Sequence, residues 1–75
     1  MTTMKDALRA KKKIQEIIKG VSGIKGVGIT WDDNRKPCVQ VNIDPAIEKS
    51  DRNKIPSHIE DVKVKIEIIE NIRLE

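Results

Sequence analysis

Cys38 and His58 are the only cysteine and the only histidine of this 75-residue chain. A thiol beside an imidazole works as nucleophile and base only when the two side chains meet and donors for an oxyanion lie nearby. Nothing in the spacing brings the two together, so we expect Cys38 to face solvent on a sheet or to pack at its edge, and His58 to lie on the surface. One cysteine and one histidine also fall short of a structural zinc site. The residues therefore predict no catalytic group, no metal site and no cofactor, and we expect that the chain is not an enzyme.

A cluster of side-chain oxygens in Asp32-Asp33-Asn34 comes nearest to a calcium-binding pattern. A calcium-binding EF-hand loop needs glycine at its sixth position and glutamate at its twelfth. Counted from Asp32, those positions hold Pro37 and Ile43. We therefore interpret the cluster as the polar turn of a hairpin, in which Asn34 tolerates a left-handed backbone.

Four glycines fall within residues 20–28, a density typical of loops that cradle phosphate. Such loops follow a strand and open a helix, whereas here a predicted helix comes first and a strand follows. Gly20 and Gly23 also have the spacing of the GxxG loop of KH domains, which clamps a nucleic-acid backbone between two helices. The alternation of a strand begins at Val27, so the second helix is missing. We favour neither form of phosphate recognition.

Positive charge gathers near the N-terminus: residues 1–25 carry a net charge of +5, and residues 26–75 carry −2. Such asymmetry is typical either of a polyanion-binding face or of a solvated helix surface. Phosphates require only positive charge, and four basic residues could supply it: Lys5, Arg9, Lys12 and Lys13. The polar face predicted for the sheet offers no aromatic platform for stacked bases, so nucleic-acid binding is the alternative function rather than the favoured one.

Hydrophobic periodicity predicts the elements that position these residues. An apolar stripe of helical spacing indicates an amphipathic helix over residues 4–19. Thr3 can cap its N-terminus, Asp6 lies near the positive end of its dipole, and Gly20 suits a left-handed C-terminal cap. The stripe consists of Ala7, Ala10, Ile14, Ile17, Ile18 and Val21.

Three stretches alternate apolar and polar residues with a period of two, the pattern of strands with one dry and one wet face. They cover residues 27–31, 39–43 and about 62–69. We expect a hairpin between the first two, a connection over residues 46–61 that crosses the sheet, and the first strand at the centre (order 2-1-3). The wet face is expected to carry Thr30, Cys38, Gln40, Asn42, Lys63, Lys65 and Glu67.

Trp31 is the only aromatic residue among Phe, Trp and Tyr. Its phase matches Val27 and Ile29, so we expect a core residue at the end of the sheet, with a contact residue for a partner as the alternative. The alternation changes phase after Ile68, and a bulge or short extension is the favoured explanation, with a frayed tail or a partner surface as alternatives. Three apolar residues follow that change: Ile69, Ile72 and Leu74.

Length and composition set the class of protein. A chain of 75 residues makes one domain, spanning residues 1–75, that hides only about 60% of its unfolded surface. The predicted fold is α+β in two layers, with one N-terminal amphipathic helix packed on a three-stranded, mainly antiparallel sheet. The chain has one cysteine, no membrane-spanning apolar stretch and no apolar run like that of a signal peptide. We therefore expect a cytoplasmic protein without a membrane partner.

Three segments carry a resemblance: Gly23-Ile24-Lys25-Gly26-Val27-Gly28-Ile29, Pro37-Cys38-Val39-Gln40-Val41 and Lys54-Ile55-Pro56-Ser57-His58-Ile59-Glu60-Asp61-Val62-Lys63-Val64. They resemble the GVxGVG strand, the VxV strand and the IP…V approach to a third strand of a small bacterial module of unknown function. That module also occurs ahead of trypsin-like serine peptidase domains. Asp61 stands where the module has glycine, and Ile69-Glu70-Asn71 lacks the glycine expected after the third strand. The resemblance implies no catalytic residue and an accessory role beside a peptidase.

The first strand is also similar to the GVxxVxV strand of ferredoxin-like metal carriers, whose paired cysteines are absent here. Metal transport is therefore not implied. Together these features predict a non-catalytic interaction or regulatory module, with another protein or domain as its partner. Nucleic-acid binding through the basic helix is the alternative, and the sequence leaves the oligomeric state open.

Overall fold

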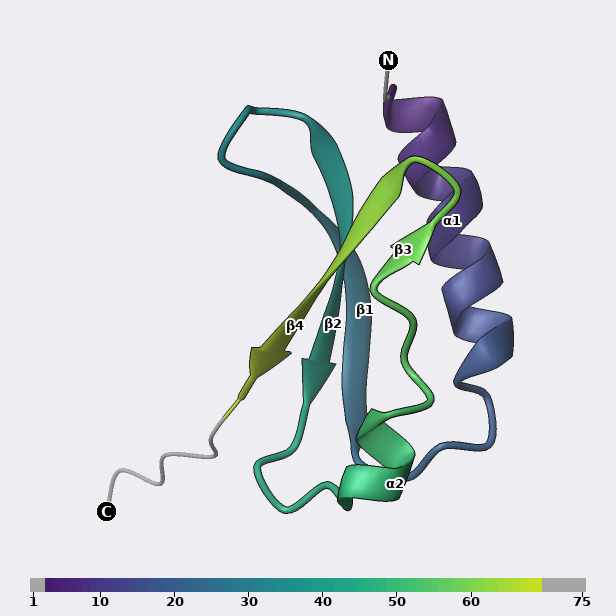
Figure 1. Cartoon of the computed structure of the whole chain (residues 1–75), viewed down its shortest axis with the longest axis vertical. Coiled ribbons are helices and arrows are strands. Elements are labelled where there is room, and N and C mark those ends of the chain that lie inside the picture. Colours follow the sequence, from purple (N-terminus) through teal and green to yellow (C-terminus); the bar gives the residue numbers. More distant parts are fainter. Residues whose placement is uncertain (1–2, 70–75) are drawn as a thin grey trace.

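The structure is a computed structural model, and it describes residues 3–69. One long helix lies along a mixed sheet of four strands (Figure 1), so the predicted α+β class is confirmed. The helices are α1 (Met4–Ile17) and α2 (Lys49–Arg52), and the strands are β1 (Ile24–Trp31), β2 (Pro37–Ile43), β3 (His58–Ile59) and β4 (Val62–Ile68).

The predicted cap of α1 is confirmed. The Asp6 N–H donates to Thr3 Oγ1 at 3.2 Å, and the Thr3 N–H donates to Asp6 Oδ2 at 3.1 Å, which satisfies donors that a helix N-terminus leaves free. The helix ends at Ile17, two residues before the predicted end. Gly20 is not left-handed; that conformation falls on Gly23 (φ 89°), where the chain turns toward β1.

The predicted strand order, 2-1-3, is wrong. The order is β1-β2-β4-β3, in which β1 and β3 pair antiparallel with their neighbours and β2 pairs parallel with β4. Burial explains why β2 takes the centre: Val39, Val41 and Ile43 are completely buried, whereas each residue of β1 keeps some exposure. Two strands that run the same way need a crossover, and the chain between β2 and β3 provides it.

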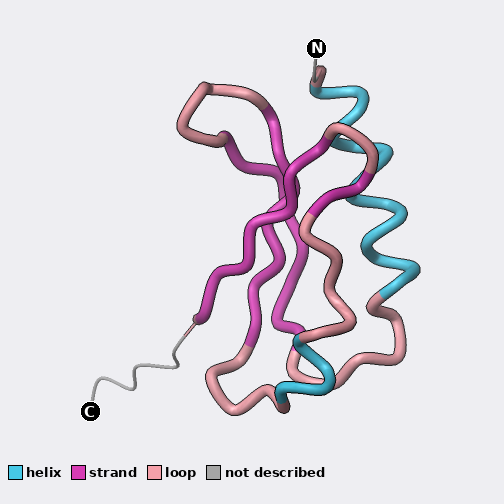
Figure 2. The backbone as a smooth tube through the Cα atoms, in the orientation of Figure 1, coloured by secondary structure: helices cyan, strands magenta, loops and turns pink. Residues whose placement is uncertain are grey.

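The crossover contains the short helix α2 and leads into a strand that was not expected. The missed element is β3, only two residues long, which forms a hairpin with β4 (Figure 2). A two-residue strand carries no alternation that the sequence could reveal.

The core lies between α1 and the sheet, because α1 packs chiefly over β1 and β2. Helix and strands contribute their apolar faces, and the connection adds Ile55. Trp31 was expected in this core, and that expectation is wrong. Its side chain lies at the outer end of the edge strand β1 and is 55% exposed. The buried residues are Ala7, Ala10, Ile14, Ile18, Val39, Val41, Ile43, Ile55, Val62 and Val64.

The bulge or short extension predicted after Ile68 lies outside the described residues except for Ile69. Up to that point the register of β2 and β4 is unbroken, ending at the pair Ile43 and Ile68, and an irregularity lies between Ile24 and Gly26 in β1. Of the apolar residues expected beyond β4, Ile69 is described and partly exposed. Ile72 and Leu74 lie outside the described residues.

Candidate functional site

The outer edge of β4 is open over its C-terminal half. The Ile69 N–H donates to the Ile43 carbonyl of β2, whereas the Val64 N–H donates to the Ser57 carbonyl on the opposite side. Alternate residues of a strand direct their backbone N–H and C=O groups to the same side. The backbone groups of Ile66 and Ile68 therefore point away from β2, as the groups of Val64 do. β3 pairs only with Val62 and Lys63. Within residues 3–69, no backbone group pairs with the outward groups of Ile66 and Ile68.

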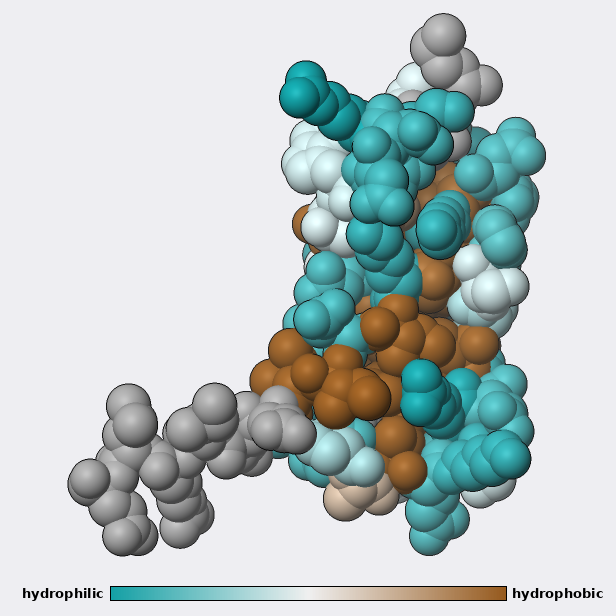
Figure 3. Space-filling model, turned by 60° about the vertical axis from the view of Figure 1, so that its left-hand side comes forward, coloured by the Kyte–Doolittle hydropathy of each residue, from teal (hydrophilic) through white to brown (hydrophobic). Residues whose placement is uncertain are grey.

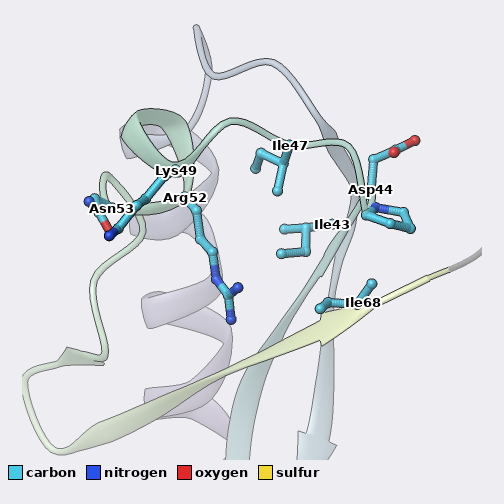
Figure 4. A pocket seen from close by; sticks show the side chains of 8 residues that line it. Ile43, Asp44, Ile47, Lys49, Arg52, Asn53 and Ile68 are labelled. Atoms are coloured by element: carbon cyan, nitrogen blue, oxygen red, sulfur yellow. The ribbon is translucent and has the colours of Figure 1, made fainter.

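A hollow of about 420 Å³ lies beside this edge, between the end of β2, α2 and the end of β4. Three isoleucines form its apolar side, one from β2, one from the crossover and one from β4 (Figure 4). The Arg52 side chain extends from α2 toward β4 across the hollow, whereas Asp44 points away from it. The hollow is lined by Ile43, Asp44, Pro45, Ile47, Lys49, Arg52, Asn53 and Ile68.

The acidic residue that lines this hollow forms an ion pair, whereas its two basic residues form none with residues 3–69. Asp44 accepts from the Ala46 N–H at 2.8 Å and lies 3.4 Å from Lys25 Nζ. The Ala46 N–H first, and then Lys25, lower the pKa of the Asp44 carboxyl. Neither Lys49 nor Arg52 has an ion-pair partner among the residues that the structure describes. The net character of the rim is therefore cationic.

Exposed aliphatic surface continues from the hollow onto the end of β4. The Ile68 side chain is 50% exposed, and Ile69 is partly exposed next to it. Figure 3 shows a hydrophobic area on this face, beside the point where the grey residues begin. Large apolar side chains that remain in water next to an unpaired strand edge mark a surface suited to binding another chain.

The structure separates the four basic residues predicted to bind polyanions. At 100° per residue, Lys5, Arg9 and Lys12 lie on the side of α1 opposite the buried alanines. Lys13 lies nearer the sheet, where its Nζ is 2.8 Å from Glu60 Oε1. Glu16 lies between the outward basic residues on the same helical face. The result is a three-residue basic face interrupted by a carboxylate.

Cys38 and His58 do not come into contact. His58 lies opposite Lys63 of β4, and the register of β2 places Cys38 on the other side of that same lysine. Two strand spacings separate them, about 10 Å. The His58 ring nitrogen Nδ1 lies 3.1 Å from Ser57 Oγ and is exposed, as expected for a surface histidine.

The expected exposure of Cys38 is wrong, because its side chain is completely buried. The predicted face is correct: Thr30 lies opposite Cys38 and the polar residues of β2 and β4 share this side of the sheet. Strands β1 and β4 flank Cys38 on both sides, whereas the larger Gln40 and Asn42 on the same face of β2 keep partial exposure. Burial raises the pKa of the Cys38 thiol, so the thiolate that nucleophilic chemistry needs is disfavoured.

The oxygens of Asp32-Asp33-Asn34 form a turn, as predicted. Asp32 Oδ1 accepts from the N–H groups of Asn34 and Lys36 at 2.8 and 2.9 Å, and these bonds lower the pKa of the Asp32 carboxyl, the Lys36 bond most. The left-handed residue is Arg35 (φ 59°), not Asn34. In the described part of the chain, no group of three His, Cys, Asp or Glu residues is arranged to hold a metal ion. Neither of its helices has the length and apolar content needed to cross a membrane.

Sequence reasoning missed the hollow itself. Arg52 and Ile47 belong to a connection without periodicity, and only the fold brings them beside Ile68. The one signal in the sequence was the phase change after Ile68, which placed apolar residues where a covered strand would not need them. No protein-family model, no curated protein and no solved structure matches the chain. The resemblance to the bacterial module therefore stays a prediction.

Proposed function

We propose that this chain is a small protein-interaction module that binds an extended segment of another protein at the outer edge of β4. The observation that carries this proposal is the apolar hollow with an unpaired guanidinium beside an open strand edge. An added strand would satisfy the outward N–H and C=O groups of Ile66 and Ile68. Its side chains would then alternate between the hollow and the solvent.

The lining of the hollow indicates the chemistry of that segment. Ile47 and Ile68, with Ile43 buried beneath them, favour an aliphatic side chain, and the cationic rim favours a carboxylate close to it in the sequence. Arg52 presents a planar fork of donors that matches a carboxylate better than a lysine does. The partner is therefore expected to be a short extended peptide segment with an aliphatic residue near Asp or Glu.

A displayed library of random peptides tests this function. We expect the enriched peptides to combine an aliphatic residue with Asp or Glu within a few positions. Arg52→Glu should weaken their binding about tenfold or more, since a hydrogen bond to a charged group contributes about 1.5–3 kcal/mol. Ile68→Lys should weaken it too, because it places a charge at the apolar side of the hollow.

Arg35→Glu is the matched control for Arg52→Glu. Arg35 is exposed in the hairpin turn, and the charge change is the same. It should leave peptide binding unchanged. The proposal would be rejected if no peptide class is enriched, or if Arg52→Glu and Ile68→Lys bind the enriched peptides as well as the unchanged chain does.

Nucleic-acid binding is the second candidate, and the outward position of Lys5, Arg9 and Lys12 on α1 favours it. Phosphate binding must weaken steeply as salt rises. Titration with a single-stranded oligonucleotide at low and physiological salt therefore separates the two functions. Salt-sensitive binding that is lost in Lys5→Glu/Lys12→Glu would support the second candidate. The accessory role beside a peptidase and the cytoplasmic location remain predictions from the sequence.

A further inference from the structure

The second open edge of the sheet belongs to β1. The Asp32 N–H donates to the Lys36 carbonyl at 2.9 Å, and these residues continue the register in which Trp31 lies opposite Pro37. In an antiparallel pair, every second residue exchanges hydrogen bonds with its neighbour, and the residues between direct their groups outward. Three residues of β1 therefore direct N–H and C=O groups away from β2: Val27, Ile29 and Trp31.

This edge has little of the protection that strand edges usually carry. From Gly26 to Trp31 the strand contains no charged residue and no proline. Lys25 is the only charge in β1, and it forms an ion pair with Asp44. A Cβ added at Gly28 would meet no atom within 4 Å, so the face of β1 away from α1 is also open. A long, uncharged and accessible edge is a template for pairing with another strand.

The helix beside this edge is also incompletely covered. Lys13 pairs with Glu60, so that flank of α1 faces the β3–β4 turn. A helix turns by about 100° per residue, which places Met4, Leu8 and Lys11 on the opposite flank of α1. This flank faces β1, because β1 and the β3–β4 turn lie at opposite edges of the sheet. Leu8 is 53% exposed, Met4 is also exposed, and Trp31 is exposed at the end of β1. Three large apolar side chains thus lie along one side of the molecule.

We propose that β1 pairs antiparallel with β1 of a second copy of this chain, with Gly28 opposite Gly28 of that copy. The outward N–H and C=O groups of β1 belong to odd-numbered residues. The pairing must therefore place odd-numbered residues of one copy opposite odd-numbered residues of the other. This register places Val27 opposite Ile29 of the second copy and joins the outward groups of both strands. No two like charges lie opposite each other, because the paired segment of Gly26 to Thr30 is uncharged. A strand identical to β1 therefore complements it.

The position of α1 fits the same arrangement. Because α1 packs over both β1 and β2, the axes of the two α1 helices would lie about 10 Å apart across the paired strands, close to the distance at which helices pack. Met4 and Leu8 would then lie in the interface. Lys11 is the charge on this flank in each copy, so salt that screens the repulsion should increase the fraction of dimer.

Paired cysteine variants test the register. In this pairing the two Gly28 residues form a pair without hydrogen bonds, with Cα atoms about 4.5 Å apart, within the range that a disulfide spans. Gly28→Cys should therefore cross-link under mild oxidation to a species of twice the 8.5 kDa chain mass. Gly26→Cys is the matched control, since its added Cβ also finds room but would lie opposite Thr30. The unchanged chain, whose Cys38 is buried, should not cross-link.

Light scattering and the single tryptophan give a second measurement on the unchanged chain. The mass should approach twice the monomer mass as concentration rises, and the Trp31 emission should shift to shorter wavelength over the same range. A mass that stays monomeric at every concentration, or equal cross-linking of the two cysteine variants, would overturn the proposal. Because Arg52 and Ile68 lie away from β1, Arg52→Glu should leave the dimer unchanged, so this proposal and the peptide-binding proposal fail independently.

Discussion

Lys13 Nζ lies 2.8 Å from Glu60 Oε1, an ion pair that joins the middle of α1 to the turn between β3 and β4. It is a long-range contact between two elements that carry opposite charge. The Lys13 hydrogen bond, followed by its charge, lowers the pKa of the Glu60 carboxyl below its ordinary value of 4.5. A carboxyl with a lowered pKa stabilises the folded state above its unfolded pKa, and loses that effect as pH falls through the folded pKa.

Lys13→Met should therefore lower the melting temperature slightly at neutral pH and have a smaller effect near pH 2, below the ordinary pKa of the Glu60 carboxyl. The neutral-pH effect should shrink with added salt, because both side chains are about half exposed or more. Thermal denaturation followed by circular dichroism measures both. Lys12→Met, which removes an outward charge without this ion pair, is the control. An equal effect of Lys13→Met at the two pH values would contradict the prediction.

The core depends on Ile14 far more than on its neighbour Ile17. Ile14 is completely buried against the sheet, whereas Ile17 is about half exposed on the same helix. Ile14→Ala should lower the free energy of unfolding by about 2–5 kcal/mol, through lost burial and the cavity left behind. Ile17→Ala should cost about 1 kcal/mol or less. Urea denaturation of the two variants provides the comparison, and equal losses would show that α1 is seated differently.

Gly23 is the glycine that the backbone requires. Its φ is +89°, and an added Cβ would lie 2.8 Å from the Cγ1 of Ile47. Gly23→Ala should therefore lower the free energy of unfolding by about 1–3 kcal/mol, from strain and a displaced isoleucine. Gly20→Ala meets no atom within 4 Å and should be neutral or stabilising by up to about 1 kcal/mol. Urea denaturation again distinguishes them, and a harmless Gly23→Ala would contradict the turn geometry.

The Cys38 thiol should be inert while the chain is folded. It is completely buried on β2, and burial raises its pKa, so both access and thiolate are reduced. A colourimetric disulfide reagent should label the native chain far more slowly than the chain in concentrated urea. Ile14→Ala, which destabilises without touching the thiol, should accelerate labelling if the reaction requires unfolding. Immediate labelling of the native chain would contradict the burial of Cys38.

The sequence predicted correctly the features that depend on residues close together in the chain. The Thr3 cap, the amphipathic helix and the turn at Asp32 follow from residues a few positions apart, and each was predicted. The side of each strand was also correct, because alternation requires only neighbouring residues. The left-handed turn residue was misplaced by one position, from Asn34 to Arg35, since the polar turn residues differ little in that preference.

Strand order and exposure depend on partners that are distant in the sequence. Trp31 has the phase of a core residue, yet it lies at the end of an edge strand, where α1 does not cover it. Cys38 has the phase of a wet-face residue, yet its side chain is completely buried. The hollow beside β4 brings Ile47, Arg52 and Ile68 together through the crossover, and no spacing along the chain predicts that meeting. The miss at Trp31 follows from placing β1 at the centre, whereas Cys38 and the hollow depend on residues that only the fold brings together.

The parallel pairing of β2 with β4 also orders events during synthesis. As the ribosome releases the chain, the hairpin of β1 and β2 can close at once, because its turn is short. The other edge of β2, which later pairs with β4, then remains unpaired until the crossover and β4 have emerged. Throughout that interval the nascent chain presents the free backbone groups of Val39 and Val41, which later face β4, to any neighbouring polypeptide or chaperone.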